Sequence, residues 1–589
     1  MCGIYGYIGN KNAAHSVQIG LKNLDYRGYD SWGIGIFNNV KILIDKHAGK
    51  ISEAENNLPN ANIAIGHTRW ATHGAVSDLN AHPHFSSDKS FILCQNGIVE
   101  NYTELKKALL KKNYRFISQT DTEIIVRQIE EESKRTSSFL DAVKIAFQKL
   151  QGRNTIIILR NNGQIICLRN GSPLVIGATP DLKEIFISSD TLSFANFTKK
   201  MLVLDNGQMA ICEKEKINLY NVVSNKKVPL QFEKIDITDN KAEKEGYPHF
   251  MIKEINDSPY VIKQICNQET KPLNKLAQAV KKADHVYTIG SGTAGVAAAQ
   301  IAYYLRVFGH IPAVNLIGAE AKDYLDLFTK KDLLIAPSQS GETADVLEIL
   351  EIAKKNGVQI ASFVNMPGSM MTRISDYKFM AQAGPEICVM STKIFVSQLA
   401  WGYLLAKTVN NENSSGKENL QNLAKVIQKY LQDKKTANQI IPIAKHLITK
   451  PHIFLLAKAQ NLQIIKEGMI KIIEGTYLHA HAVPAGDLKH YIITLMEKGI
   501  PVITVLSNDE AQKDVINAIN QIKTRGAEII GIANQKNTDF DFYLPVPEVG
   551  EASAIMNVIP LQLLAYYMAL NLGNNIDKPR NIAKSVTVK

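Results

Sequence analysis

From about Lys275 onward, the sequence alternates short runs of apolar residues with amphipathic helical patterns. The runs are continuously apolar, which is typical of strands that are buried on both faces of a parallel sheet. Such runs occupy residues 286–289, 332–336, 359–364, 452–456, 500–506 and 527–532. Because parallel strands need a crossover segment between them, this half of the chain is expected to form parallel sheets built from strand–helix–strand units.

The first 235 residues follow another pattern, in which short apolar runs are broken by turn residues. Residues 154–159 and 164–168 flank the turn residues 161–163, an arrangement that predicts a β-hairpin. Helical patterns cover about 16–24 and 122–132. These features favour an α+β fold, in which helices cover a sandwich of sheets.

Two polar stretches divide the chain of 589 residues, which is too long for a single hydrophobic core. Residues 236–246 are mostly charged, and residues 410–419 are polar throughout. The expected organisation is an α+β domain followed by two α/β lobes with parallel sheets. Its parts are a domain over 1–235, a linker over 236–247, a first lobe over 248–415 and a second lobe over 416–589.

The formal net charge is +11, but the basic residues are scattered and do not form a block interleaved with aromatic residues. Nucleic-acid binding is therefore not expected, whereas a mild basic excess suits small anionic substrates. The six cysteines include no CxxC pair, which argues against a zinc site and a disulfide framework. The first ten residues lack the pattern of a secretory signal. The expected location is the cytoplasm.

Residues 552–576 carry no charge and are numerous enough to cross a bilayer. The stretch also contains Asn557, Pro560, Gln562 and Asn571, whose polar groups or helix-disrupting ring are costly in hydrocarbon. The better interpretation is a helix buried in the protein, and no membrane span is expected.

Cys2 directly follows the initiator methionine, so removal of Met1 would leave a thiol on the first residue. An α-amino group has a reference pKa of about 7.7 to 8.0, and its neutral form can act as general base for the adjacent thiol. By itself, a cysteine at this position is more often an ordinary buried thiol. The surrounding motifs decide between the two interpretations.

Five separated motifs occur in a fixed order: MCGIYGYIG at 1–9, DYRGYDSWG at 25–33, GHTRWATHG at 66–74, QNGIVEN at 95–101 and TDTE at 120–123. Together they resemble the glutaminase domain of the class II, N-terminal-nucleophile, glutamine amidotransferases. The resemblance covers about the first 235 residues. It implies that Cys2 attacks the amide of glutamine while Asn96 and the N–H of Gly97 stabilise the oxyanion.

The same resemblance implies the contacts to the free amino acid. Arg69 would pair with the α-carboxylate of glutamine and Asp121 with its α-ammonium group. Trp70 would line the route by which ammonia leaves, and His73 would belong to the glutamine site. Four histidines, His67, His73, His82 and His84, could instead form a metal cluster, but packing or polar support is favoured because no acidic pair stands at ligand spacing.

In the second half, residues 286–295 read as a strand followed by G-x-G-x-x-G, formally a dinucleotide fingerprint. The next strand runs into SQSGET at 338–343, a hydroxyl-rich turn at an expected helix N-terminus, which suits a single phosphate group. This turn resembles that of sugar isomerase domains, which would make the lobes a tandem pair. The resemblance implies that the phosphate contacts Thr293, Ser338, Gln339, Ser340 and Thr343, with Val389 and Ser391 nearby.

Ketose chemistry requires ring opening, imine formation and proton movement between two carbons, and each step needs a titratable group. By resemblance, His490, Lys584 and Glu474 stand at the places of these groups. Lys471, which lies on the same helix face as Glu474, and Ala583, which precedes the lysine in the tail, would contact the substrate.

The two resemblances together imply transfer of the amide nitrogen of glutamine to fructose 6-phosphate with isomerisation. The products would be glucosamine 6-phosphate and glutamate, on the route to UDP-N-acetylglucosamine. They imply neither a cofactor nor a metal, and they suggest a homodimer in which His490 serves the neighbouring subunit. Two alternatives stay open: a related enzyme that acts on another keto-sugar phosphate, and a sugar-phosphate-sensing protein with reduced catalysis.

Departures from the family pattern occur around the expected sugar site. Ala294 replaces a serine, the segment 457–459 replaces a glycine-rich turn, and residues 491–492 replace a Gly-Pro pair that follows the catalytic histidine. The acid–base groups are kept, so these departures bear on which ketose is used.

Overall fold

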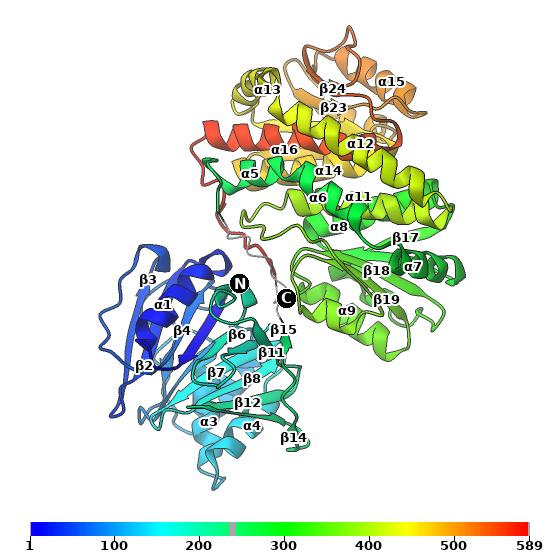
Figure 1. Ribbon diagram of the computed structural model, residues 1–589. Coiled ribbons are helices and arrows are strands. Elements are labelled where there is room, and N and C mark those ends of the chain that lie inside the picture. Colours follow the sequence, from blue (N-terminus) through cyan, green and yellow to red (C-terminus); the bar gives the residue numbers. More distant parts are fainter. Residues whose placement is uncertain (1, 235–242, 587–589) are drawn as a thin grey trace. The chain divides into compact units, whose positions relative to one another are not determined.

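The computed structural model describes residues 2–234 and 243–586, and its contacts divide the chain into two compact units (Figure 1). The described part of the first unit covers residues up to 234, with the short segments 342–344 and 585–586. The second unit covers the remaining described residues from 243 to 584. Each unit has its own sheets and cores.

The first unit contains two sheets. The eight-stranded sheet has the order β15-β11-β9-β10-β1-β4-β2-β3, and the seven-stranded sheet has the order β14-β13-β12-β8-β7-β6-β5. The strands of the first sheet are β1 (Gly3–Ile8), β2 (Ser31–Phe37), β3 (Ile42–Ala48), β4 (Ile63–Arg69), β9 (Val175–Ala178), β10 (Ile185–Ser188), β11 (Lys200–Val203) and β15 (Glu233–Lys234). Those of the second are β5 (His84–Phe85), β6 (Phe91–Gly97), β7 (Asn154–Arg160), β8 (Ile165–Asn170), β12 (Gln208–Glu213), β13 (Lys216–Asn221) and β14 (Lys227–Val228).

The two sheets are stacked face to face. Because side chains alternate between the two faces of a strand, a strand contributes both to the core between the sheets and to the layer outside them. In β1, Ile4 and Ile8 belong to the core between the sheets, whereas Tyr5 and Tyr7 pack toward α1 (Ala13–Asn23). The outer face of the second sheet is covered by α3 (Thr122–Ser133) and α4 (Phe139–Gln148), and α2 (Tyr102–Leu110) packs against α3. The result is a four-layer sandwich, helix–sheet–sheet–helix.

The second unit contains two parallel five-stranded sheets with the orders β17-β16-β18-β19-β20 and β22-β21-β23-β24-β25. The first comprises β16 (Val286–Gly290), β17 (Ala313–Ile317), β18 (Leu333–Ser338), β19 (Gln359–Val364) and β20 (Tyr377–Met380). The second comprises β21 (His452–Ala457), β22 (His479–Pro484), β23 (Pro501–Val505), β24 (Glu528–Ala533) and β25 (Phe542–Pro545). In both, the first strand in the chain lies second in the sheet, so the lobes share one topology.

Helices surround both sheets of the second unit, and one apolar core contains residues of both lobes, including Ile335 and Ile503. The helix α11 is buried along its entire length, and α16 packs against α14 and α13. The helices are α5 (Phe250–Asn256), α6 (Ser258–Asn267), α7 (Thr270–Lys282), α8 (Gly292–Val307), α9 (Ala344–Lys355), α10 (Met370–Ile374), α11 (Lys393–Val409), α12 (Asn413–Gln432), α13 (Lys434–Leu447), α14 (Leu462–Thr476), α15 (Gln512–Lys523) and α16 (Ser553–Asn571).

The predicted fold class is confirmed: an antiparallel sandwich precedes two parallel-sheet lobes. The hairpin is β7 paired with β8, and the predicted buried strands are β16, β18, β19, β21, β23 and β24. The linker predicted over 236–247 lies largely outside the described residues, and the domain boundaries stay predictions. The uncharged segment near the C-terminus forms α16. One helical span, Gly550–Asn571, is apolar enough to cross a membrane by length and composition, but 89% of its apolar window is buried in the protein.

Candidate active sites

Cys2 lies at the start of β1, where the sulfur faces the residue after β4. The backbone N–H of Trp70 donates to Cys2 Sγ at 3.3 Å. Burial raises the pKa of the Cys2 thiol, and the Trp70 N–H and the Arg69 guanidinium oppose that rise. The thiol is therefore uncharged at rest and needs a base before it can act as a nucleophile. Met1 and its predicted removal lie outside the described residues.

Asn96 and Gly97 end β6 and lie next to Cys2. The amide Nδ2 of Asn96 donates to the backbone oxygen of Cys2 at 3.1 Å. Gly97 has a φ of 134°, and a Cβ at this position would lie 2.0 Å from the backbone oxygen of Arg153. Glycine is thus required here both by the backbone conformation and by the nearby backbone of Arg153.

His67 fixes the orientation of Asn96. Its Nε2 lies 2.8 Å from the backbone oxygen of Gln95 and 3.2 Å from Oδ1 of Asn96. Because a carbonyl oxygen can only accept, Nε2 carries the hydrogen, and Asn96 presents its Oδ1 to His67 and its Nδ2 to Cys2. Burial lowers the pKa of His67 to about 3, so the ring is neutral.

His82 and His84 support the same region as neutral rings. Burial holds the pKa of each well below its ordinary value. His82 Nε2 contacts the hydroxyl of Thr122 at 3.0 Å, and that hydroxyl donates to Gln95. His84 Nε2 contacts the hydroxyl of Thr120 at 3.0 Å. These contacts agree with polar support, and no group of residues suited to a metal ion occurs in the described part of the chain.

Arg69 and Asp121 are both buried at this site. The Arg69 guanidinium donates to the backbone oxygens of residues 73, 74 and 75. The Asp121 carboxylate accepts the N–H of Val99 at 2.8 Å, and burial raises the pKa of Asp121. Both side chains act electrostatically on the Cys2 thiol. The residues predicted to bind the α-carboxylate and the α-ammonium group of glutamine therefore lie close to this thiol.

Trp70 and His73 lie in the loop after β4. The indole of Trp70 packs against the ring of Tyr29, with centroids 6.0 Å apart, and His73 packs edge-on against Tyr102 at 4.9 Å. Asp30 accepts the backbone N–H of Ala71 at 2.9 Å. The loop is therefore anchored on both sides of Trp70.

In the second unit, Lys584 is almost completely buried, with its side chain 3% exposed. Its ammonium forms an ion pair with Glu386 and donates to the backbone oxygen of Cys388 at 2.7 Å. Burial by itself would raise the pKa of Glu386, but the Lys584 ammonium and backbone N–H groups hold it below its ordinary value. The two opposite charges are therefore buried together, and removal of either one would leave the other without its partner.

Glu386 also organises the segment that follows it. It accepts the backbone N–H groups of Thr392 and Ile394 and the hydroxyl of Ser391 at 3.0 Å. Val389 in the same segment donates its N–H to the backbone oxygen of Asp577. The structure thereby brings Val389, Ser391 and the tail with Ala583 and Lys584 together.

The tail is anchored before it reaches Lys584. The carboxylate of Asp577 accepts the N–H groups of Phe250 and Met251 at 3.0 Å each, at the start of α5. Three residues later, the N–H of Arg580 donates to the hydroxyl of Tyr477. Asp577 thus joins the last segment of the second unit to its first helix.

A second charged cluster lies on α14. The ammonium of Lys471 lies 2.5 Å from Glu474 and 3.5 Å from Glu467, and Lys471 and Glu467 are buried. The hydroxyl of Thr293 donates to Glu467 at 3.4 Å. Burial raises the pKa of Glu467 to about 8. Thr293, expected at the phosphate, is thereby placed beside the charged cluster of the other lobe.

The SQSGET segment forms a turn between β18 and α9. The hydroxyl of Ser338 accepts the N–H of Gly341 at 2.9 Å, and Gly341 has a φ of 67°. Gln339, Ser340 and Thr343 are half-buried. The hydroxyls therefore lie immediately before a helix N-terminus, as the sequence predicts.

His490 ends a short 3-10 helix, η6 (Leu488–His490), and is exposed. Within the described residues, no side-chain contact joins it to Lys584 or Glu474. Its assignment to the site stays a prediction.

Three residues of these sites were not found from the sequence as functional groups: His67, Glu386 and Glu467. Glu467 stands four residues before Lys471, so helical spacing could have revealed it. His67 lies in a recognised motif, but only the contact with Asn96 shows its role. Glu386 is 198 residues from Lys584 in an irregular segment, and no local pattern marks it.

Comparisons with known proteins identify the family of both halves of the chain. A family model described as a glutamine amidotransferase domain matches residues 37–163, and one described as a SIS domain matches 279–408 and 446–572. The chain is 38% identical to a glutamine–fructose-6-phosphate aminotransferase (isomerizing) of Pyrococcus horikoshii and 37% identical to one of Thermococcus kodakarensis, over all of each chain. It is also similar to the solved C-terminal domain of a glucosamine-fructose-6-phosphate aminotransferase from Francisella tularensis. That comparison has 30% identity and a TM-score of 0.52, and it covers 57% of this chain and all of the other.

Proposed function

The chain belongs to the glutamine–fructose-6-phosphate aminotransferase family, and on that premise we propose that it transfers the amide nitrogen of glutamine to fructose 6-phosphate with isomerisation. The products are glutamate and glucosamine 6-phosphate. The main support for this proposal is that relatives named for this activity align with this chain from end to end. The arrangement around Cys2 and around Lys584 supports it.

In the first unit, Cys2 attacks the amide carbon of glutamine and the amide nitrogen leaves as ammonia, which leaves a thioester on Cys2. Water then hydrolyses the thioester to glutamate and the free thiol. A neutral ring that donates its Nε2–H is a poor base, so His67 does not take the proton of the thiol. The base is the α-amino group of Cys2 itself after Met1 has been removed. Asn96 and the N–H of Gly97 stabilise the oxyanion of the tetrahedral intermediate.

Arg69 and Asp121 hold the ends of glutamine. A guanidinium has five N–H donors, and those not directed to the 73–75 loop pair with the α-carboxylate of the substrate. Asp121 pairs with the α-ammonium group, which favours ionisation of its buried carboxyl. His73 and Trp70 complete this side of the site, and Trp70 lines the route of the ammonia.

In the second unit, the turn 338–343 binds the phosphate group, and the acid–base groups act on the carbon chain. Ser338, Gln339, Ser340 and Thr343 supply hydrogen bonds at the N-terminus of α9. The Lys584 amine forms an imine with the keto carbon and water leaves. Ammonia then displaces the lysine to give the imine of the free sugar, and Glu474, held by Lys471, moves a proton from the first carbon to the second. His490, contributed by the second subunit of a homodimer, opens the sugar ring.

The division into a glutaminase domain over 1–235, a linker over 236–247 and two sugar isomerase lobes over 248–415 and 416–589 is part of this proposal. So is a cytoplasmic location, which is supported by six cysteines that are all free. Nucleic acid and membrane are not among the proposed partners.

The direct test is to incubate the protein with fructose 6-phosphate and glutamine labelled on its amide nitrogen, and to identify the product by mass spectrometry. Label in a hexosamine phosphate, in equal amount to glutamate, is expected. Ala294 and the segments 457–459 and 491–492 depart from the family pattern, so other ketose phosphates belong in the same assay. Release of glutamate with label in a different amino sugar would identify another ketose as the substrate.

A control variant is Cys2→Ala, which should lose all use of glutamine while the isomerisation of fructose 6-phosphate continues. If Cys2→Ala still transferred labelled nitrogen, the assignment of the nucleophile would be wrong.

A further inference from the structure

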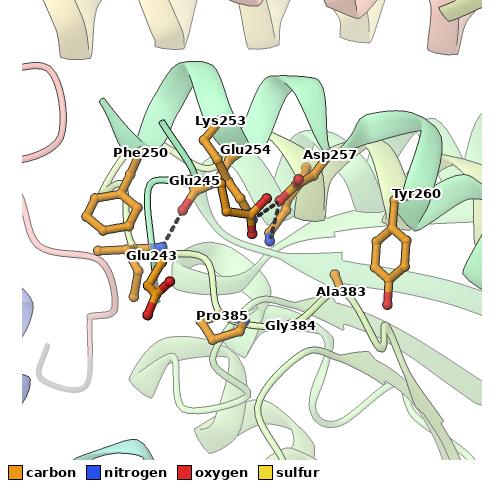
Figure 2. A pocket seen from close by; sticks show the side chains of 12 residues that line it. Glu243, Glu245, Phe250, Lys253, Glu254, Asp257, Tyr260, Ala383, Gly384 and Pro385 are labelled. Atoms are coloured by element: carbon orange, nitrogen blue, oxygen red, sulfur yellow. Dashed lines mark hydrogen bonds and ion pairs between the residues drawn. The ribbon is translucent and has the colours of Figure 1, made fainter. Parts of the chain in front are cut away.

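A cavity of about 320 Å³ lies in the second unit and borders the segment that binds Lys584. Its walls are α5, α6 and the segment 383–387, together with Lys393 at the start of α11. Figure 2 shows Lys253, Glu254 and Asp257 extending from the helices toward Gly384 and Pro385. The lining contains four carboxyl groups and two lysines, from Glu243, Glu245, Glu254, Asp257, Lys253 and Lys393.

Both lysines are already neutralised. Lys253 lies 2.9 Å from Asp257 and 3.3 Å from Glu245, and Lys393 lies 3.0 Å from the same oxygen of Asp257. The carboxyl group of Glu254 takes part in none of these ion pairs, so it adds a hydrogen-bond acceptor to the lining. Once ionised, this acceptor suits a cation that carries several N–H donors.

Glu254 provides an independent indication of a ligand. It is 1% exposed and lines the cavity, and its Oε1 accepts the backbone N–H groups of Ile387 and Cys388 at 2.5 and 3.2 Å. Its Oε2 is buried and has no hydrogen-bond partner among the described residues. An unsatisfied buried oxygen destabilises the folded protein, and an occupant of the cavity that donates a hydrogen bond to it would remove this cost.

We propose that this cavity is a second binding site, which takes a small molecule carrying a primary ammonium group and uses Glu254 Oε2 as its acceptor. The ammonium has three donors on one compact charge, and the aromatic rings of Phe250 and Tyr260 line the same space. The site itself does not depend on the proposed reaction.

Occupation of the site is connected to Lys584 through the segment 386–388. Glu254 holds the N–H groups of residues 387 and 388, whereas Lys584 binds Glu386 and the backbone oxygen of Cys388. A ligand on Glu254 thus acts on the segment that holds the imine-forming amine. This connection rests on the proposed function.

Binding of an ammonium group at this site is expected to release a proton. Burial, and next the charge of Glu386, raise the pKa of Glu254 to about 8, while Lys584 and Lys393 oppose the rise. Glu254 is therefore mostly protonated at pH 7 in the empty site. A bound ammonium favours the carboxylate, so binding at pH 7 releases a proton, and affinity increases with pH until about pH 8.

The experiment is calorimetric titration of the full-length protein with methylammonium, which stays protonated in this range as lysine does. Titration at pH 7 in buffers of different ionisation enthalpy is expected to show release of close to one proton per bound cation, and at pH 9 almost none. Glucosamine should bind with the same signature, and N-acetylglucosamine, which has no cationic group, should not bind. Absence of methylammonium binding, or binding without proton release at pH 7, overturns the proposal.

Glu254→Gln is the decisive variant, because a neutral amide keeps an oxygen for the N–H groups of residues 387 and 388. It should weaken methylammonium binding at least tenfold at pH 8 and abolish the proton release. Glu243→Gln removes an exposed carboxyl from the same lining and serves as the matched control, with proton release unchanged. Equal proton release in Glu254→Gln and the wild type would also overturn the proposal.

The connection to Lys584 has a separate readout. Borohydride trapping of the imine between Lys584 and fructose 6-phosphate should change in rate at least twofold when methylammonium saturates the wild type, and should not respond in Glu254→Gln. An unchanged rate with normal binding refutes the connection and leaves the site. Failure of trapping under all conditions argues against the proposed reaction and not against the site.

Discussion

The two parallel-sheet lobes share one strand order but differ in the segments that follow corresponding strands. After β18 in the first lobe, the turn 338–343 presents hydroxyls before α9. After β23 in the second lobe, the hydroxyl of Ser507 is engaged by the amides of Asn461 and Asn557 at 2.8 and 3.1 Å. Asp509 and Glu510 follow in this second turn, and their charges repel a phosphate group.

The helices that follow the first strand of each lobe also differ, but here the charged residues lie in the second lobe. In the second lobe, α14 carries Glu467, Lys471 and Glu474, whereas α8 in the corresponding place of the first lobe begins with Gly292, Thr293 and Ala294. Thr293 reaches Glu467 across the lobes. In the proposed reaction, one topology would therefore support two tasks: the first lobe would hold the anionic end of the substrate, and the second would supply the groups that move protons.

The largest expected effect tests whether the tail after the second lobe supplies the nucleophile. Lys584→Ala should lower sugar amination on the order of 10³-fold or more, because no amine remains to form the imine, while glutamate release continues. Lys584→Arg keeps the charge beside Glu386 and should be equally inactive. Substantial activity in Lys584→Arg, measured as amino sugar formed, would assign the lysine a purely electrostatic role.

The next effect concerns proton movement by the second lobe. Glu474→Gln should lower kcat of the sugar reaction by roughly 10² to 10⁴, the usual contribution of a general acid or base, with little change in KM for fructose 6-phosphate. Steady-state kinetics at saturating glutamine measures both constants. A higher KM with an unchanged kcat would instead show that Glu474 contributes to the binding of fructose 6-phosphate.

A smaller effect tests the phosphate turn of the first lobe. Ser340→Ala should raise KM for fructose 6-phosphate about tenfold, as expected for one hydrogen bond to a charged group, and leave kcat nearly unchanged. Ser507→Ala in the second lobe is the matched control and should leave KM unchanged, because Ser507 is bonded to buried amides. Equal changes in KM in the two variants would mean that the two turns do not differ in phosphate binding.

The smallest effect is on stability. Burial raises the pKa of Glu467 to about 8, so the folded protein binds this proton more tightly than the unfolded chain. The contribution of Glu467 to the free energy of unfolding is therefore full below its unfolded pKa and is lost as the pH rises toward 8. Glu467→Gln should lose less thermal stability than the wild type between pH 5 and pH 9. If both melting temperatures declined in parallel, Glu467 would not be the group that titrates.

The central strands of both lobes could be predicted from the sequence, but their edge strands could not. The strands β17, β20, β22 and β25 stand at the sheet edges, and each contains exposed or half-buried residues, so their apolar pattern is interrupted. The antiparallel hairpin of β7 and β8 was recognisable because its turn residues mark it locally.

The candidate sites divide in a similar way. Cys2, Asn96 and Arg69 stand in sequence motifs, and the structure places them around one thiol. Glu386 could not be predicted, because its importance comes only from a partner almost two hundred residues away. Glu254 likewise appears as an ordinary helical residue until its unpaired oxygen is seen next to a cavity.

The attachment of Asp577 to the start of α5 has a consequence for the order of synthesis. Residues 2–234 can leave the ribosome and form the complete sandwich while most of the chain is still untranslated. The sugar site must wait for the last dozen or so residues, because they bring the lysine to Glu386. A nascent or prematurely terminated polypeptide can thus contain a folded half that releases ammonia but no sugar site to accept it. Ammonia can be transferred to the sugar only after the C-terminus is complete.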